Sequence, residues 1–189
     1  MWKSKISIQN KIFNTNMRKV VVASDSFKGC LTSAQVADAV EKGIHEVYPE
    51  CEVVKLGVAD GGEGTLDVFR KTYGGTEITM TVDGPLVGQV EATYLILHDG
   101  KTAVIEMASV CGLTLVPEDR RDPIKSTTYG LGQLIMDAIG RGCRKVIVTL
   151  GGSATVDAGL GMLSALGLRF YNDGSYQGGR MPNACDGAE

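Results

Sequence analysis

Residues 145–157 read Lys145-Val146-Ile147-Val148-Thr149-Leu150-Gly151-Gly152-Ser153-Ala154-Thr155-Val156-Asp157, and an apolar helical pattern follows. The β-branched run before the glycines is typical of a parallel strand that is buried on both faces. Gly151 and Gly152 let main-chain amides approach a ligand, while Ser153 and Thr155 add hydroxyls in front of a helix. The stretch therefore predicts an α/β fold. Taken alone, its loop fits both a phosphate site and an ordinary turn.

Composition places the chain among globular proteins and against nucleic-acid binders, because 43% of its 189 residues are hydrophobic, 22% are charged and the net charge is -3. The 25 glycines gather at the ends of apolar runs, which favours a site built from loops. The 5 cysteines form no CxxC pair, so we expect reduced thiols in a cytoplasmic protein and no metal cluster of Cys and His.

The amino-terminal residues 1–16 are polar and lack the apolar core of a signal peptide. We expect them to form a disordered extension before a domain that starts near Met17. Nothing in the sequence predicts export or a membrane span.

Two βα units follow this extension. The first has a strand over 20–23, then Asp25, Ser26 and Lys28, then a helix announced by the capping-box spacing of Thr32 and Gln35. Polar residues at the carboxyl end of a buried strand occupy the edge where open α/β sheets bind ligands.

The second unit has a strand over 52–58 and a helix over 64–73. Between them lies a glycine-rich loop with two carboxylates, which fits a loop of active-site type, although a solvated turn is the alternative. The loop residues are Asp60, Gly61, Gly62, Glu63, Gly64 and Thr65. Since crossover connections are right-handed, we expect this loop to share one sheet edge with the Asp25 loop.

The pattern changes after residue 76, where apolar and polar residues alternate up to Val82. We place a domain boundary after Val82. Strands over 90–97 and 102–107 are joined by a hairpin turn at 98–101. Gly100-Lys101-Thr102 imitates the end of a P-loop, but Leu95 stands where its first glycine should be. Glu106 lies in an apolar strand, so it needs a partner or a ligand.

The last third of the chain starts with a hydroxyl-rich segment that contains Thr127 and Thr128. Helix capping and a polar ligand explain these hydroxyls equally well. A helix over 131–139, the strand 145–149 and a short strand over 168–171 follow, and residues 175–189 show no periodicity.

Five motifs in order make residues 17–170 resemble the bacterial glycerate kinases of the type I, glycerate 2-kinase family. They are Ala23-Ser24-Asp25-Ser26-Phe27-Lys28-Gly29, Ala59-Asp60-Gly61-Gly62-Glu63-Gly64-Thr65, Val104-Ile105-Glu106-Met107-Ala108, Thr127-Thr128-Tyr129-Gly130 and Gly151-Gly152-Ser153-Ala154-Thr155-Val156-Asp157. The resemblance implies transfer of the γ-phosphoryl group of ATP to D-glycerate, with 2-phosphoglycerate as the favoured product. It also implies two α/β domains, one inserted into the other.

The resemblance and the needs of phosphoryl transfer assign roles to the motif residues. Lys28 is expected to bind a phosphate or the substrate carboxylate, and Asp60 and Asp157 to bind Mg²⁺ or act as base. Phosphates or substrate are expected on the remaining residues, which are Asp25, Ser26, Gly61, Gly62, Glu63, Gly64, Thr65, Glu106, Thr127, Thr128, Gly151, Gly152, Ser153 and Thr155.

In this interpretation residues 17–82 begin a Rossmann-like parallel-sheet domain and residues 83–189 form part of a second α/β domain. The last residues do not continue the family pattern, so we expect a truncated chain that is poorly active alone. A non-catalytic metabolite- or nucleotide-binding module and a galactokinase-type small-molecule kinase remain alternatives. The regiochemistry, the preferred nucleotide and the oligomeric state are not determined by the sequence.

Overall fold

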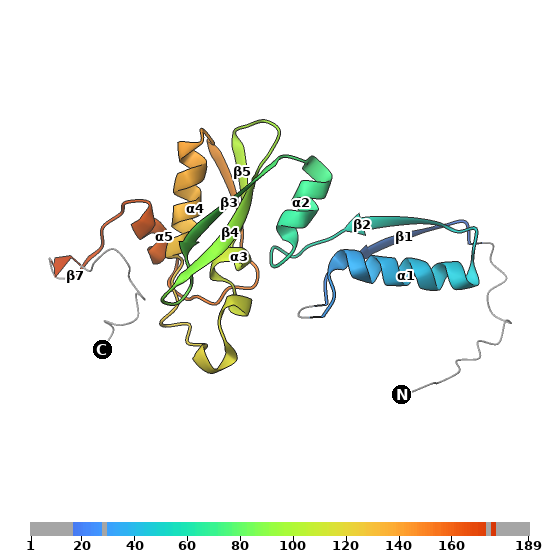
Figure 1. Ribbon diagram of the computed structural model, residues 1–189, viewed down its shortest axis with the longest axis horizontal. Coiled ribbons are helices and arrows are strands. Elements are labelled where there is room, and N and C mark those ends of the chain that lie inside the picture. Colours follow the sequence, from blue (N-terminus) through green and yellow to red (C-terminus); the bar gives the residue numbers. More distant parts are fainter. Residues whose placement is uncertain (1–16, 28–29, 173–174, 177–189) are drawn as a thin grey trace. The chain divides into compact units, whose positions relative to one another are not determined.

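The computed structural model describes residues 17–27, 30–172 and 175–176 (Figure 1). The chain divides into two compact units, Met1–Gly57 and Val58–Glu189. Residues 1–16 and Lys28 lie outside the described residues, so the predicted extension and the predicted role of Lys28 stay predictions.

The first unit is a βαβ motif. Strands β1 (Lys19–Ser24) and β2 (Glu52–Gly57) pair in parallel from Lys19↔Glu52 to Ser24↔Gly57, and helix α1 (Ser33–Val47) connects them. The predicted capping box is present: the hydroxyl of Thr32 accepts from the amide of Gln35, whose side chain accepts from the amide of Thr32. Lys55 of β2 contacts Asp38 and Glu41 of α1 at 2.7 and 2.8 Å, which ties the helix to the sheet.

The second unit is built on a mixed sheet in the order β3-β4-β5-β6. Strands β3 (Thr76–Asp83), β4 (Gln89–Ile96) and β5 (Thr102–Glu106) are antiparallel neighbours, and β6 (Lys145–Thr149) runs parallel to β5. Helix α2 (Thr65–Tyr73) precedes the sheet, and helix α4 (Tyr129–Gly140) connects β5 to β6. Shorter elements complete the unit: α3 (Ala108–Cys111), η1 (Leu113–Leu115), η2 (Glu118–Arg120), α5 (Leu160–Ala165), β7 (Tyr171–Asn172) and β8 (Ser175–Tyr176).

Strand β5 is buried along its whole length because helices cover both faces of the sheet. Ala103 and Ile105 join the main core with Leu131 and Leu134 of α4. Alternate residues of a strand point to opposite faces, so Glu106 points to the other face, which contacts α2. Figure 1 shows α4 and α2 on the two sides of this sheet.

The structure differs from the sequence prediction at one strand, and the predicted domain ranges 17–82 and 83–189 stay predictions. The described chain divides between Gly57 and Val58, and β3, which pairs along its length with β4, belongs to the second unit. The predicted strand over 168–171 is reduced to Tyr171–Asn172, because the amide of Leu168 donates to the carbonyl of Leu163 at the end of α5. The mixed α/β class and the parallel β1–β2 pair are as predicted, and β6 is the parallel strand that its sequence indicated, with β5 as its partner.

None of the helices in the described part of the chain has both the length and the apolar composition that a transmembrane span needs.

Candidate functional site

The candidate site forms where the parallel strands β5 and β6 end. Glu106 and Thr149 are register partners and the last residues of these strands, so the segments that follow leave the sheet at the same edge. The amide of Met107 donates to the carbonyl of Thr149 at 3.2 Å, which holds the two segments together. This is the edge at which open α/β sheets present ligand-binding loops.

Two glycine-rich loops meet backbone to backbone at this edge. The amide of Gly151 donates to the carbonyl of Gly61 at 2.8 Å. A Cβ atom at position 151 would lie 2.3 Å from the nitrogen and 2.4 Å from the Cα of Gly62, so only glycine fits there. The loop of residues 59–65 and the loop after β6, which are 90 positions apart at Gly61 and Gly151, therefore form one layer.

Many amides of these loops are already used inside the protein. The amide of Gly62 donates to Oδ1 of Asp60 at 2.9 Å, that of Ala154 to the carbonyl of Cys111 at 3.0 Å, and that of Thr155 to Oγ of Ser153 at 3.1 Å. Gly152 and Ser153 are exposed. The part of the second loop that faces solvent, and could meet a phosphate, is thus the short segment Gly152–Ser153.

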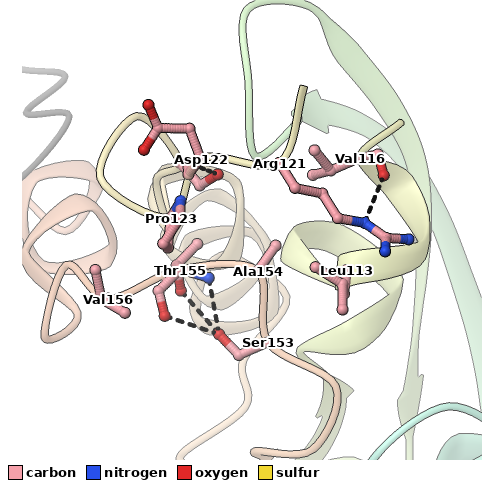
Figure 2. Close-up of a pocket in the computed structure, with 10 residues that line it drawn as sticks. Leu113, Val116, Arg121, Asp122, Pro123, Ser153, Ala154, Thr155 and Val156 are labelled. Carbon is pink, nitrogen blue, oxygen red and sulfur yellow. Dashed lines mark hydrogen bonds between the residues drawn. The ribbon is translucent and has the colours of Figure 1, made fainter. Parts of the chain in front are cut away.

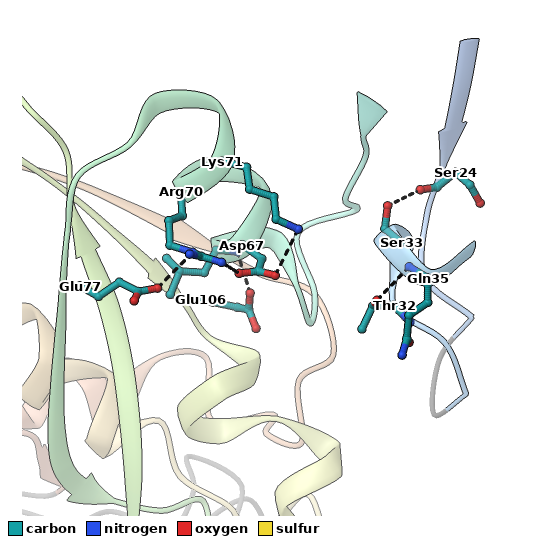
Figure 3. Close-up of polar contacts among 10 residues, drawn as sticks. Ser24, Thr32, Ser33, Gln35, Asp67, Arg70, Lys71, Glu77 and Glu106 are labelled. Carbon is teal, nitrogen blue, oxygen red and sulfur yellow. Dashed lines mark hydrogen bonds and ion pairs between the residues drawn. The ribbon is translucent and has the colours of Figure 1, made fainter. Parts of the chain in front are cut away.

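Glu106 lies beneath the first loop and not on its surface. Its side chain is buried, and Oε2 accepts from the amide of Leu66 at 2.8 Å, in the first turn of α2 (Figure 3). Burial raises the pKa of Glu106, while hydrogen bonds from amides of that turn partly oppose the shift. The partner that the sequence required is therefore backbone at a helix N-terminus, where a carboxylate is stabilised.

Thr65, at the start of α2, also faces inward. It is buried, and its hydroxyl donates to the carbonyl of Gly62 at 2.7 Å. Gly64, at the N-cap, has a φ of 88°, a conformation that favours glycine. Glu63 is exposed, and its Oε1 would lie 3.9 Å from a Cβ atom on Gly152. Of this group, Glu63 is the side chain that reaches the second loop.

Asp157 is 1% exposed, and both oxygens of its carboxylate accept hydrogen bonds from groups inside the protein. Oδ2 accepts from the amide and the hydroxyl of Thr128 at 2.8 and 2.7 Å and from the amide of Gly161 at 3.1 Å. Oδ1 accepts from the amide of Gly159 at 3.0 Å. A metal ligand needs lone pairs that face the ion, so this geometry does not fit Mg²⁺ on Asp157.

The two buried threonines are likewise part of the framework. The hydroxyl of Thr128 accepts from the amide of Met162 at 2.9 Å in addition to its bond to Asp157. The hydroxyl of Thr127 accepts from the amide of Tyr129 at 3.2 Å, and its amide donates to the carbonyl of Pro85 at 2.9 Å. Of the two explanations for these hydroxyls, the structure favours internal bonding at the start of α4.

Ser153 and Thr155 border a pocket of about 140 Å³ (Figure 2). Their hydroxyl oxygens lie 3.0 Å apart. The remaining lining comes from segments 113–116, 121–126 and 154–156. Arg121 contributes a cation that the sequence analysis missed. The only sequence signal was a pair of arginines ahead of Asp122-Pro123, which resembles any charged surface turn.

The first unit holds the remaining candidates. Asp25 and Ser26 follow β1 and are half-buried, and Oδ1 of Asp25 accepts from the amide of Ser26 at 2.7 Å. Their predicted approach to the Asp60 loop stays a prediction, since each unit is described by itself.

Among the described residues, no group of three or more His, Cys, Asp or Glu side chains could hold a metal ion. Mg²⁺ in phosphoryl-transfer sites often uses only one or two carboxylates plus the phosphates themselves. Asp60 supplies one such carboxylate: it is exposed in the first glycine loop, and its Oδ1 also accepts from the amide of Gly62.

Comparisons with known proteins point in one direction. A family model described as the glycerate kinase family matches residues 20–184. The chain is 48% identical over 154 residues to a glycerate kinase from Bacillus cereus and 46% identical over 151 residues to the glycerate 2-kinase from Escherichia coli. These alignments cover 82% and 80% of this chain and 40% of each relative. The chain therefore spans about 40% of the length of the curated relatives it matches.

A crystal structure described as a "putative glycerate kinase 2" from Salmonella typhimurium LT2 matches with a TM-score of 0.65 and 41% sequence identity. The match covers 84% of this chain and 43% of that one.

Proposed function

Because this chain belongs to the glycerate kinase family, we propose that it supplies phosphate- and substrate-binding loops to an enzyme that transfers the γ-phosphoryl group of ATP to a hydroxyl of D-glycerate, with 2-phosphoglycerate as product. The observation that carries the proposal is the layer formed by the Gly61–Gly62 and Gly151 backbones at the carboxyl end of β5 and β6. Phosphoryl transfer depends on positioning and on neutralising charge, and a rigid loop layer serves the first need.

The exposed parts of that layer receive the direct roles. Gly152 and Ser153 would face phosphate oxygens with an amide and a hydroxyl, and Thr155, whose hydroxyl oxygen lies 3.0 Å from that of Ser153, would bind a phosphate or the substrate. Asp60 would hold Mg²⁺, which when bound neutralises charge on the transferred phosphoryl group. In the first unit, Asp25, Ser26 and Lys28 keep their proposed role of binding the substrate or a phosphate.

The buried carboxylates receive supporting roles. Asp157 ties the segment after the second loop to the start of α4, and Glu106 ties the first turn of α2 to the end of β5. Both carboxylates thus fix segments that adjoin the glycine layer. We therefore assign Asp157 and Glu106 to positioning, and the base that accepts the hydroxyl proton to the exposed loops.

Ligand binding by the 189-residue chain and turnover by a full-length relative test this proposal. Calorimetry with MgATP and with D-glycerate measures binding to the chain, and a coupled assay measures ADP release by the relative. The equivalent of Asp60→Asn in that relative is expected to lower glycerate-dependent ADP release by about 100-fold, the scale seen when one charge-stabilising group is removed.

The matched control is Asp67→Asn, which removes a carboxylate that pairs with Arg70 and Lys71 on the surface of α2 (Figure 3). Such an exposed pair contributes little stability, so the control should behave like the parent. A folded chain that binds neither ligand, or an Asp60→Asn variant with parental turnover, would contradict the assignment.

A further inference from the structure

We propose that the pocket beside Ser153 and Thr155 binds the carboxylate of a small hydroxy acid, with Arg121 as its cationic partner. The inference rests on the proposed function, because it names the place where the acid substrate of that reaction would sit. It adds one residue, Arg121, to the residues of the proposed site.

The pocket has the chemical make-up of a site for a small polar anion. Its walls are apolar over Leu113, Val116, Pro123, Ala154 and Val156, and its polar groups include the hydroxyls of Ser153 and Thr155 and the guanidinium of Arg121. A few polar groups on an apolar wall are typical of small-molecule sites, where they set orientation.

Arg121 is placed to bind a carboxylate. Its Nε donates to the carbonyl of Val116 at 3.4 Å, which steadies the side chain beside the pocket (Figure 2). Its other contact, Nη1 to Oε1 of Glu118, is 3.7 Å long, and the Glu118 side chain is 87% exposed. Such an exposed pair is weak. The planar guanidinium fork matches a carboxylate and can exchange this partner for a ligand.

One carboxylate, that of Asp122, also lines the pocket and would oppose an anion if it faced inward. Its Oδ2 lies 3.0 Å from Nζ of Lys125, and its Oδ1 accepts from the amide of Ile124 at 3.1 Å. Figure 2 shows this carboxylate on the outer side of its loop, away from Ser153. The charge of Asp122 is thus paired with Lys125, which leaves the pocket side to Arg121.

The volume of the pocket favours a small acid over a nucleotide as its ligand. A cavity of about 150 Å³ holds a molecule of the size of benzene, and this pocket measures about 140 Å³. A three-carbon hydroxy acid fits that space, whereas a whole nucleotide does not. Ser153 and Thr155 border the pocket and also continue the loop whose Gly151 packs on Gly61 and Gly62. An acid held here would therefore lie next to the proposed phosphate segment.

Amide-resolved NMR titrations of the ¹⁵N-labelled 189-residue chain test the inference, with D-glycerate, inorganic phosphate and ATP as separate probes. D-glycerate is expected to shift the amides of Arg121, Ser153 and Thr155 together. Arg121→Ala should raise its Kd by about 10- to 100-fold, the range for losing a hydrogen bond to a charged group. Arg121→Lys, which keeps the charge without the fork, should fall in between.

The matched control is Arg120→Ala, because Arg120 is the exposed neighbour on the same turn and does not line the pocket. An equal loss of affinity in the Arg120 and Arg121 variants would overturn the inference. So would glycerate leaving these amides unmoved, or phosphate and ATP shifting them while glycerate does not. If glycerate binds here in an Arg121-dependent way but the chain does not bind MgATP, the pocket stands and the kinase proposal fails.

Discussion

Replacing Gly151 with alanine should separate the two glycine loops. The added Cβ atom would lie 2.3 Å from the nitrogen of Gly62, 2.4 Å from its Cα and 2.7 Å from the carbonyl carbon of Gly61. All three are backbone atoms, which cannot rotate aside as a flexible side chain could. One loop must move, and the hydrogen bond from the Gly151 amide to the Gly61 carbonyl is then lost or stretched.

The expected cost follows from these two effects. Inserting a methyl group into a packed site typically costs about 1–3 kcal/mol, and losing one hydrogen bond adds about 1 kcal/mol. The sum is about 3 kcal/mol of unfolding free energy. For a chain of this length each kcal/mol lowers the melting temperature by about 2–4 °C, so we expect a fall of roughly 10 °C.

Thermal unfolding followed by circular dichroism measures this fall. Gly140→Ala is the matched control, since Gly140 ends α4, is exposed, and has no atom within 4 Å of the added Cβ. Alanine is favoured over glycine in a helix by about 0.5–1 kcal/mol, so this variant should melt at the parental temperature or slightly above.

A Gly151→Ala variant that melts within about 2 °C of Gly140→Ala would refute the packing of the two loops. It would also remove the observation on which the proposed function depends.

Three further outcomes are expected. Asp157→Asn should lower the unfolding free energy by about 3 kcal/mol in urea titrations, because an amide has a single acceptor oxygen and its NH₂ must face either the amide of Gly159 or the donors of Thr128 and Gly161; a loss no larger than that of Asp67→Asn would contradict this. Burial raises the pKa of Glu106, so the folded chain binds the proton more readily than the unfolded chain, and stability should fall as pH rises from 4.5, the ordinary value, through the folded pKa. Glu106→Gln should lack that fall, and a parental pH profile would argue against it. Burial also raises the pKa of the Cys111 thiol to about 12, so mass spectrometry after brief alkylation should find exposed Cys30 labelled long before Cys111; equal labelling would contradict the burial.

Local patterns were enough to predict most helices and strands. The hairpin between β4 and β5 follows from two strand-like runs and the turn at residues 98–101, and it is confirmed by the pairing of Tyr94 with Ile105. The start of α1 follows from Thr32 and Gln35, whose reciprocal capping bonds are present. Both features depend on residues that are close in sequence, where spacing and turn chemistry decide the outcome.

The limits of the units were not predictable in the same way. Strand β3 shows the alternation expected of a strand, but the alternation does not say which sheet it joins. Its pairing with β4 places it in the second unit. Similarly, the strand-like run at residues 168–171 forms a strand only from Tyr171, and the amide of Leu168 bonds instead to the carbonyl of Leu163 in α5.

By itself the sequence determined the α/β class, the family resemblance and the loops that carry carboxylates, hydroxyls and glycines. Only the tertiary structure decided which of those groups can face a ligand. Asp60 and Asp157 look alike in sequence, each beside glycines after a strand, yet Asp60 is exposed and Asp157 is 1% exposed with donors from Thr128, 29 positions away. Glu106 likewise binds Leu66, 40 positions away. The physical reason is that the burial of a carboxylate is set by how distant segments pack around it, and no local pattern specifies that packing.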